Sequence, residues 1–201
     1  MTLFYGLTGS IGMGKSTTAE MFRKAGIDVY DADATVHNLY AGRAAPVVEE
    51  AFPGTVTDGI VDRQKLSRYV IGDEAAMKKL ESLIHPMVRQ EEEKFRTTVS
   101  QRGAKLAVLD NPLLFEMGAA DKVDGVILVT APAEVQRERV LQRPGMTVEK
   151  FNAILARQMP DSEKRKRADF IVDTSLGLDH AEQEVTRIIE AISNRTGDQN
   201  A

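Results

Sequence analysis

Short apolar runs alternate with amphipathic stretches along much of the chain. The clearest runs are Leu3–Thr8, Leu106–Asp110 and Gly125–Val129, and their continuous apolar character predicts strands that are covered on both faces. Ile27–Tyr30 and Phe170–Asp173 predict two further strands. Strands that alternate with helices favour a parallel sheet between two helical layers. We therefore predict a three-layer α/β fold with a five-stranded parallel sheet.

The stretch between the second and third predicted strands lacks a long strand pattern. A small extended pair is expected around Asp58-Gly59, and the rest has helical patterns. The expected helices are Ala44–Ala51, Arg63–Ile71, Glu74–Ile84 and Pro86–Gln101, with Pro86 in the first turn of the last one. Because this stretch is too long for a simple crossover, we interpret residues 33–102 as a helical domain that holds the second substrate. It would be inserted into a core formed by residues 1–32 and 103–201.

The C-terminal third has the pattern of helices around one strand. Pro132 is expected to start a helix that ends near Gln142, and Thr147 is expected to cap another. Leu178–Ser193 predicts a terminal amphipathic helix, followed by a frayed polar tail over Asn194–Ala201. The basic run Lys164–Arg167 is interpreted as solvated surface, with contact to the nucleotide as the alternative.

Gly9–Ser16 has the pattern G-x-x-x-x-G-K-[ST], and it lies between the first predicted strand and a predicted helix. Glycines at positions 9, 12 and 14 allow backbone angles that a Cβ would forbid, so that N–H groups can converge on an anion. Lys15 supplies a positive charge to the outer phosphates, and the Ser16 hydroxyl can bind Mg²⁺. The pattern predicts binding of a nucleoside triphosphate.

Three carboxylates follow the ends of predicted strands: Asp31, Asp33 and Asp110. Ligands of such sheets bind at the carboxyl ends of the strands, so these acids are expected near the phosphates. We assign Asp33 as the base that orients the attacking hydroxyl, and Asp31 or Asp110 as the residue that holds the waters of Mg²⁺. The alternative for the three acids is a helix cap or a turn.

Arg139 and Arg143 lie four residues apart and share one helix face, just before Pro144-Gly145. Guanidinium groups suit phosphate oxygens, and closure over them would exclude water. We interpret residues from about 138 to about 160 as a lid over the triphosphate. A solvated helix face balanced by neighbouring glutamates is the alternative.

The composition bounds the remaining possibilities. The chain has 201 residues and no cysteine, with 42% hydrophobic residues, and its net charge of -4 gives no general attraction to nucleic acid. Neither a signal peptide nor a membrane span is apparent in the pattern. We expect a cytoplasmic enzyme that is a monomer or a small homo-oligomer, with small-molecule substrates and no nucleic-acid or membrane partner.

The motifs together resemble the dephospho-CoA kinase family. The residues that carry the resemblance are Gly6–Gly9, Ile11-Gly12, Gly14–Ser16, Asp31–Asp33, His85-Pro86, Pro112–Glu116, Gln136, Arg139, Arg143, Gln158 and Ala168-Asp169. It implies transfer of the ATP γ-phosphate, with Mg²⁺, to the ribose 3′-hydroxyl of dephospho-CoA.

The resemblance also implies roles for individual residues. It implies catalytic roles for Lys15, Asp33 and Arg139. The residues implied in binding ATP are Thr8, Gly9, Ile11, Gly12, Met13, Gly14, Lys15, Ser16, Thr17 and Arg143. The residues implied near the acceptor are Asp33, His85, Leu113, Leu114, Phe115 and Gln158. For His85, a local hydrogen bond is the alternative. Thr174 stands where the family often has Asn, which leaves its contact with adenine open.

Two other functions remain as alternatives. A P-loop kinase of another small acceptor, such as a nucleoside monophosphate, would have the same general layout. A non-catalytic nucleotide switch is disfavoured, because no Asp of this chain has Gly three positions later.

Overall fold

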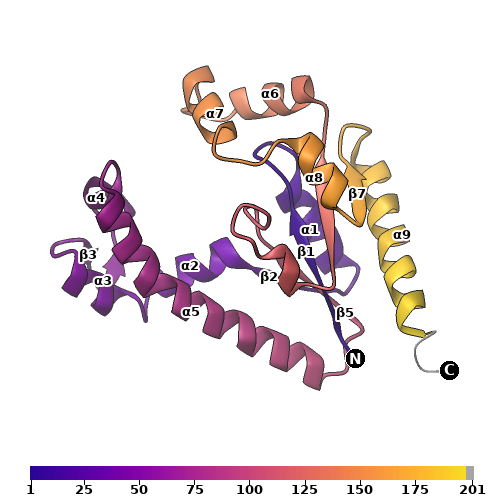
Figure 1. Ribbon diagram of the computed structural model, residues 1–201, viewed down its shortest axis with the longest axis horizontal. Coiled ribbons are helices and arrows are strands. Elements are labelled where there is room, and N and C mark those ends of the chain that lie inside the picture. Colours follow the sequence, from indigo (N-terminus) through magenta and orange to yellow (C-terminus); the bar gives the residue numbers. More distant parts are fainter. Residues whose placement is uncertain (198–201) are drawn as a thin grey trace. The chain divides into compact units, whose positions relative to one another are not determined.

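The computed structural model describes residues 1–197, and these include a five-stranded parallel sheet (Figure 1). Its strands are β1 (Leu3–Thr8), β2 (Asp28–Asp31), β5 (Leu106–Asp110), β6 (Gly125–Thr130) and β7 (Phe170–Asp173). They are arranged in the order β2-β5-β1-β6-β7. The central strand β1 pairs in parallel with β5 and β6. The predicted α/β fold class is confirmed.

Two helices, α1 (Lys15–Lys24) and α9 (Leu178–Gly197), pack on one face of this sheet. Side chains alternate between the faces of a strand, so Tyr5 and Leu7 of β1 both point to this side. They join Phe22 of α1 and Ile192 of α9 in one buried cluster. The opposite face is covered partly by the chain after β5, where Leu114 packs on Val126 of β6.

The described chain divides into two compact units. One comprises residues 1–30 and those from 99 onward, and the other comprises Asp31–Thr98. The helices of the second unit are α2 (Ala32–Tyr40), α3 (Ala45–Ala51), α4 (Arg63–Val70) and most of α5 (Glu74–Gln101). They enclose their own apolar cluster, which includes Leu39, Val48, Phe52, Leu66 and Ile84. The assignment of this unit to acceptor binding remains a prediction.

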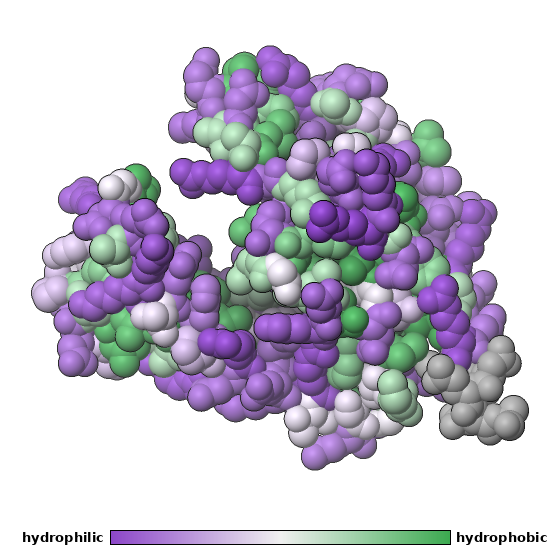
Figure 2. Space-filling view, viewed as in Figure 1, coloured by the Kyte–Doolittle hydropathy of each residue, from purple (hydrophilic) through white to green (hydrophobic). Residues whose placement is uncertain are grey.

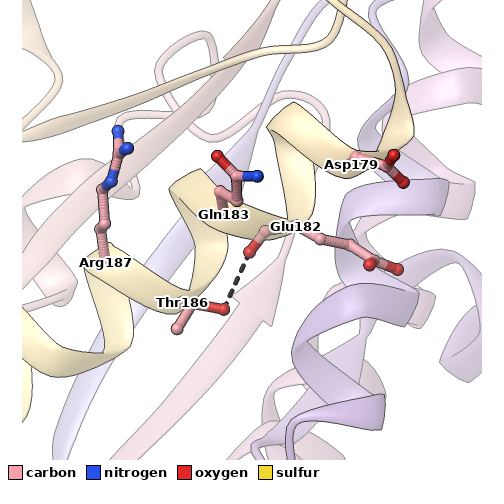
Figure 3. A pocket seen from close by; sticks show the side chains of 5 residues that line it. All are labelled: Asp179, Glu182, Gln183, Thr186 and Arg187. Atoms are coloured by element: carbon pink, nitrogen blue, oxygen red, sulfur yellow. Dashed lines mark hydrogen bonds between the residues drawn. The ribbon is translucent and has the colours of Figure 1, made fainter.

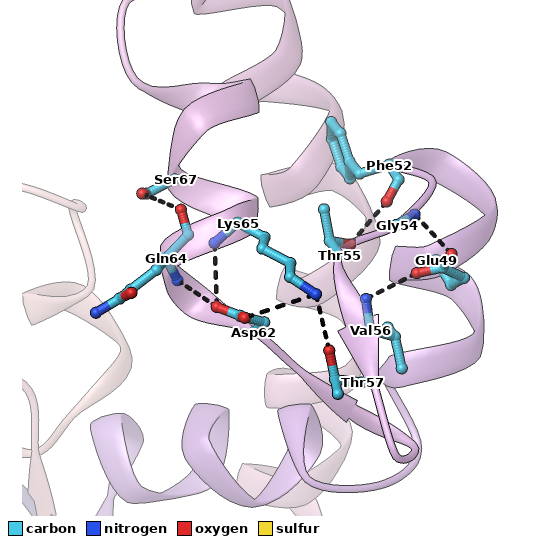
Figure 4. Close-up of polar contacts among 10 residues, drawn as sticks. All are labelled: Glu49, Phe52, Gly54, Thr55, Val56, Thr57, Asp62, Gln64, Lys65 and Ser67. Carbon is cyan, nitrogen blue, oxygen red and sulfur yellow. Dashed lines mark hydrogen bonds and ion pairs between the residues drawn. The ribbon is translucent and has the colours of Figure 1, made fainter.

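The expected extended pair is present as β3 (Val56–Thr57) and β4 (Ile60–Val61), which pair antiparallel. Side-chain contacts hold both ends of this hairpin (Figure 4). The Glu49 carboxylate accepts hydrogen bonds from the N–H groups of Gly54 and Val56, at 2.7 and 2.8 Å. These bonds lower the pKa of Glu49. After the hairpin, the Asp62 carboxylate accepts the N–H groups of Gln64 and Lys65 and so caps α4.

The prediction of two helices on either side of Pro86 was wrong. A single helix, α5, runs through that residue. Proline inside a helix loses one backbone hydrogen bond and crowds the preceding turn, at a cost of roughly 3 kcal/mol. Leu80 and Ile84 before Pro86, and Met87 and Val88 after it, pack against the same apolar cluster. Burial of both sides in one cluster therefore outweighs the local preference of proline for a first turn.

The second strand and the residues after it also differ from the prediction. The strand covers Asp28–Asp31 in place of Ile27–Tyr30, and α2 follows it without a loop. The Asp31 carboxylate accepts the N–H of Ala34 at 2.8 Å, which is the usual N-cap arrangement. Asp33 therefore lies in the first turn of α2 and not at the end of a strand.

Three short helices follow β6: α6 (Ala133–Leu141), α7 (Val148–Leu155) and α8 (Asp161–Arg167). The predicted N-cap of α7 is confirmed, because the Thr147 hydroxyl accepts the N–H of Lys150. Helix α8 was not expected. The basic residues in its last turn complement the negative end of the helix dipole.

The terminal helix extends beyond its predicted end. The chain from Asn194 to Gly197 is helical, so the frayed tail predicted from Asn194 was wrong there; the remaining part of that prediction lies outside the described residues. Arg195 contributes to this extension, because its guanidinium binds the Tyr5 hydroxyl at 3.3 Å and lies over the Phe170 ring. Hydrophilic residues cover most of the face shown in Figure 2. No helix in the described part of the chain has both the length and the apolar character needed to cross a bilayer.

Candidate nucleotide-binding site

The loop between β1 and α1 has the backbone shape that anion binding requires. Gly12 and Gly14 adopt positive φ angles of 79° and 91°. The N–H of Met13 donates to the carbonyl oxygen of Ser10 at 3.1 Å and closes a tight turn. Gly14 then starts α1 without a side-chain cap, so the N-terminal N–H groups of this helix have no side-chain partner at the N-cap position. A helix that begins in this way favours a bound phosphate.

The loop is packed tightly against its surroundings. A Cβ atom on Gly9 would lie 2.6 Å from the carbonyl oxygen of Val129 at the end of β6. A Cβ atom on Gly12 would collide with a methyl group of Val140 and lie 3.0 Å from the carbonyl oxygen of Gln136, both on α6. Glycine is therefore required at position 12 by space as well as by backbone angle. At position 9 it is required by space alone, because Gly9 does not adopt a positive φ, which corrects the prediction for that residue.

Lys15, the first residue of α1, forms an ion pair with Asp110 at the end of β5. The distance from Nζ to Oδ1 is 2.5 Å, and the side chains are 14% and 4% exposed. The parallel pairing of β1 and β5 places Leu7 opposite Asp110 and so brings this acid to the loop. Asp110 thus holds the lysine charge beside the expected phosphate site, and the structure brings these two predicted site residues together.

Ser16 and Thr17 are exposed in the first turn of α1. They lie at one end of a groove of about 360 Å³ between α1 and α9, which is also lined by Glu20, Met21, Lys24, Leu178 and Glu182. A second depression, of about 460 Å³, lies on α9 alone (Figure 3). Its five lining residues are polar or charged side chains of that one helix, and none of them is a predicted site residue.

No group of three acidic or histidine side chains within the described residues could hold a metal ion by itself. Mg²⁺ in nucleotide sites is bound by one or two protein oxygens together with phosphates and water. The exposed hydroxyl of Ser16 beside the loop, with the Asp110 carboxylate at the neighbouring strand end, is a donor set that fits this pattern.

Of four further predicted residues, Thr8 is the last residue of β1, and Leu113–Phe115 follow β5. The buried Thr8 hydroxyl donates to the carbonyl oxygen of Pro112 at 3.4 Å. Leu114 and Phe115 are 2% and 8% exposed and pack with Val126, whereas Leu113 is exposed. The chain after β5 is therefore anchored by two apolar side chains, and only Leu113 of the three is exposed, at 38%.

Two glutamine side chains bind the backbone of Ile11 in the loop. Its N–H donates to the Gln158 side-chain oxygen at 3.1 Å, and its carbonyl oxygen accepts the Gln136 side-chain N–H at 2.7 Å. The roles predicted for Ile11 in ATP binding and for Gln158 in acceptor binding remain predictions.

Arg139 on α6 makes two hydrogen bonds to Thr174, the residue that follows β7. Its two terminal nitrogens donate to the Thr174 hydroxyl and carbonyl oxygens, each at 2.8 Å. The same hydroxyl donates to the carbonyl oxygen of Met13 in the phosphate-binding loop. Thr174 therefore connects Arg139 to the loop, and this role had no signal in the sequence. Arg143 is exposed and lies beyond the end of α6 at Leu141, so the prediction that the two arginines share one helix face was wrong.

Asp31, Asp33 and His85 belong to the second unit. The Asp31 carboxylate is engaged as the cap of α2. Asp33 and His85 are exposed, and neither side chain has a hydrogen bond or ion pair within the described residues. The base assigned at Asp33 remains a prediction, and its carboxylate is accessible.

The basic run Lys164–Arg167 is not uniformly solvated, which corrects the prediction. Lys164 is fully buried, and its Nζ lies 2.9 Å from Oε1 of Glu116. Arg165 binds Asp161 and the Thr130 hydroxyl, while Lys166 is exposed. Helical spacing turns one residue of the run inward, and its partly buried partner Glu116 is distant in sequence, so a local charge pattern could not predict the pair.

The carboxyl groups of Glu116 and Asp173 have lowered pKa values. Burial raises the pKa of Glu116, but the Lys164 ammonium and the Met159 N–H outweigh it and keep that pKa below its ordinary value. Partial burial also raises the pKa of Asp173, but hydrogen bonds from the hydroxyl and N–H of Ser175 outweigh it and keep that pKa below its ordinary value. Both groups therefore carry a negative charge at neutral pH.

A glycine loop between a central strand and the first helix, with a paired lysine, places the protein in the P-loop class of nucleotide-binding α/β proteins. The structure of a shikimate kinase from Acinetobacter baumannii shares this fold, with a TM-score of 0.54 at 17% identity. The family model for dephospho-CoA kinase matches residues 3–180. The chain belongs to the dephospho-CoA kinase family.

Relatives of known name agree with this membership. The chain is 59% identical to the dephospho-CoA kinase of Mesorhizobium japonicum over 192 residues, which cover 96% of this chain and 98% of that protein. It is 56% identical to the dephospho-CoA kinase of Brucella melitensis, over 94% and 95% of the two chains. The structure of dephospho-CoA kinase from Campylobacter jejuni matches with a TM-score of 0.69 at 26% identity, over 95% of this chain and 97% of that one.

Proposed function

We propose that the protein transfers the γ-phosphate of ATP to the ribose 3′-hydroxyl of dephospho-CoA, with coenzyme A and ADP as products. The observation that carries this proposal is the P-loop with its Lys15–Asp110 pair, in a chain that matches the dephospho-CoA kinase family from residue 3 to residue 180. The enzyme is an ATP-dependent phosphotransferase with an alcohol acceptor.

The donor phosphates bind at the loop. N–H groups of Gly12–Ser16 and the first turn of α1 point their partial positive charge at the β- and γ-phosphates. The Lys15 ammonium, held by Asp110, neutralises charge on the transferring group. Ser16 holds Mg²⁺, with Asp110 or Asp31 holding its waters, and the bound ion supplies further positive charge to the phosphate oxygens.

The acceptor is activated by Asp33. Its exposed carboxylate has no competing partner among the described residues, so it can accept the proton of the ribose hydroxyl. His85 and Leu113–Phe115 are assigned to the neighbourhood of the acceptor, and residues 33–102 to its binding. Arg139 and Arg143, within a lid over about 138–160, stabilise the phosphates.

The net charge of -4 supports action without a nucleic-acid partner. We assign the enzyme to the cytoplasm, as a monomer or small homo-oligomer without a membrane partner. Sedimentation of the purified protein with and without both substrates tests the oligomeric state.

The decisive experiment measures ADP release by a coupled assay, with and without dephospho-CoA, and identifies the product by mass spectrometry. We expect ADP release that depends on dephospho-CoA and a product heavier by one phosphate, at the 3′ position. Lys15→Met is the matched control for contaminating kinases, and its activity should be at background. Phosphorylation of UMP, CMP or shikimate in preference to dephospho-CoA would overturn the proposal.

A further inference from the structure

We propose that Gln158 is a positioning residue of the donor site, and that the buried Glu116–Lys164 pair holds it against the phosphate-binding loop. The proposal rests on the function proposed above, because it concerns the binding of ATP at the same loop. It gives Gln158 a role toward the donor, where the family resemblance implies a role toward the acceptor.

The first step is the hydrogen bonding of Ile11. Its N–H is bound by Gln158, and its carbonyl oxygen is bound by Gln136, whose side chain is 5% exposed. The two peptide groups that flank Ile11 are thereby fixed in orientation. Gly12 follows directly with a φ angle of 79°, and it turns the next N–H groups of the loop. A change in the Ile11 peptides would therefore change the direction of the donors that bind phosphate.

The second step is the anchoring of Gln158. It lies after α7, in a turn where its own N–H donates to the carbonyl oxygen of Leu155 at 3.0 Å. The next residue, Met159, donates its N–H to Oε1 of Glu116 at 2.7 Å. This bond ties the backbone beside Gln158 to the chain that follows β5.

The third step is the burial of the charged pair. Lys164 has no exposed surface, and its Nζ lies 2.9 Å from the Glu116 oxygen that also binds Met159. Beyond this ion pair, neither Nζ of Lys164 nor Oε2 of Glu116 has a hydrogen-bond partner within the described residues. A buried ion pair adds little net stability over well-packed apolar side chains. We infer that the ion pair acts mainly by fixing positions, because Lys164 sets the position of Glu116, and Glu116 sets that of residues 158 and 159.

The first test is Gln158→Leu, which removes the acceptor oxygen and keeps the side chain nearly the same size. Calorimetric titration uses AMP-PNP with Mg²⁺ in one experiment and dephospho-CoA alone in another. Loss of one hydrogen bond predicts a rise of roughly twofold to tenfold in the Kd for AMP-PNP, with the Kd for dephospho-CoA unchanged. Steady-state kinetics should show the same division, with a higher KM for ATP only. Weaker binding of dephospho-CoA with unchanged binding of AMP-PNP would overturn the proposal.

The second test changes the ion pair. Lys164→Met should weaken AMP-PNP binding, and the effect of Gln158→Leu should be smaller in the Lys164→Met background, because the two residues act in one chain of contacts. Lys166→Met is the matched control, since Lys166 lies on the same helix, is exposed and pairs with Glu163. Its affinity for AMP-PNP should equal that of the wild type.

Lys164→Met leaves Glu116 buried without its partner, so its fold is checked by thermal melting. The double variant Glu116→Leu/Lys164→Met removes both charges together and is expected to fold. It should still bind AMP-PNP more weakly than the wild type, and a folded double variant with wild-type affinity would refute the role of the pair. The AMP-PNP titrations do not depend on which acceptor the wild type phosphorylates, so failure of the proposed function would be recognised separately, by wild-type protein that binds AMP-PNP but not dephospho-CoA.

Discussion

Replacement of Gly12 by alanine tests whether the phosphate-binding loop is fixed by its packing as well as by its backbone angles. Gly12 and Gly26 have nearly equal φ angles, 79° and 80°. A Cβ on Gly12 would collide with Val140 and crowd a backbone carbonyl oxygen of α6, whereas a Cβ on Gly26 would have nothing within 4 Å. The two substitutions therefore share the backbone strain and differ in the collision.

The magnitudes follow from these contacts. A non-glycine residue in the left-handed region costs roughly 1–2 kcal/mol, which is the full expected loss for Gly26→Ala. Overpacking adds about 1–3 kcal/mol to this cost, so the free energy of unfolding should fall by about 2–5 kcal/mol in Gly12→Ala. In a chain of this size each kcal/mol lowers Tm by roughly 2–4 °C. Gly12→Ala should also lower kcat/KM for ATP, because relief of the collision moves the loop.

Thermal unfolding followed by circular dichroism, together with the coupled assay, measures both effects. Gly26→Ala should keep the wild-type kcat/KM. Equal losses of stability in the two variants, or a wild-type kcat/KM for Gly12→Ala, would show that the loop tolerates the Cβ and that our account of its packing is incorrect.

Three further predictions concern single side chains. Asp33→Asn should lower kcat on the order of 10²- to 10⁴-fold in the coupled assay, and Lys15→Ala should lower it at least as much. Near-normal turnover of Asp33→Asn would refute the assignment of Asp33 as the base. Asp62→Ala should destabilise the protein to urea by about 1 kcal/mol, since it removes the cap of α4, and an unchanged midpoint would contradict that role. The pKa of Asp173 is lowered in the folded state, so its stabilising effect is present above the ordinary value of 3.8 and is lost as the pH falls through the folded pKa. The Tm difference between the wild type and Asp173→Asn should accordingly shrink below that pH, and a constant difference would refute the assignment.

The parts of the fold that depend on local pattern could be predicted from the sequence. The apolar run before Gly9 and the helix after Ser16 are local signals, and they give β1, the loop and α1. The cap at Thr147 and the hairpin around Asp58-Gly59 also depend on neighbouring residues only, and both are present.

The parts that depend on distant contacts could not be predicted in this way. Pro86 is tolerated inside α5 because apolar residues on both sides of it share one cluster, which a propensity for a first turn does not report. Buried Lys164 pairs with Glu116, which lies almost fifty positions earlier in the chain. The hydrogen bond from Ile11 to Gln158 joins residues that are 147 positions apart. The carboxylates and arginines assigned to catalysis were chosen for their chemistry, and their roles remain predictions.

The order of strands in the sheet has a consequence for how such an enzyme could change its acceptor. Strands β2 and β5 are neighbours, and the whole second unit, Asp31–Thr98, is inserted between them in the chain. Its helices follow β2 and precede β5 in the chain, and they enclose an apolar cluster of their own. Evolution could therefore exchange the second unit as a single cassette without altering β1, the glycine loop or the pairing of Lys15 with Asp110. One phosphate-donating module could in this way have been reused with different acceptor modules through replacement of one contiguous stretch of the gene.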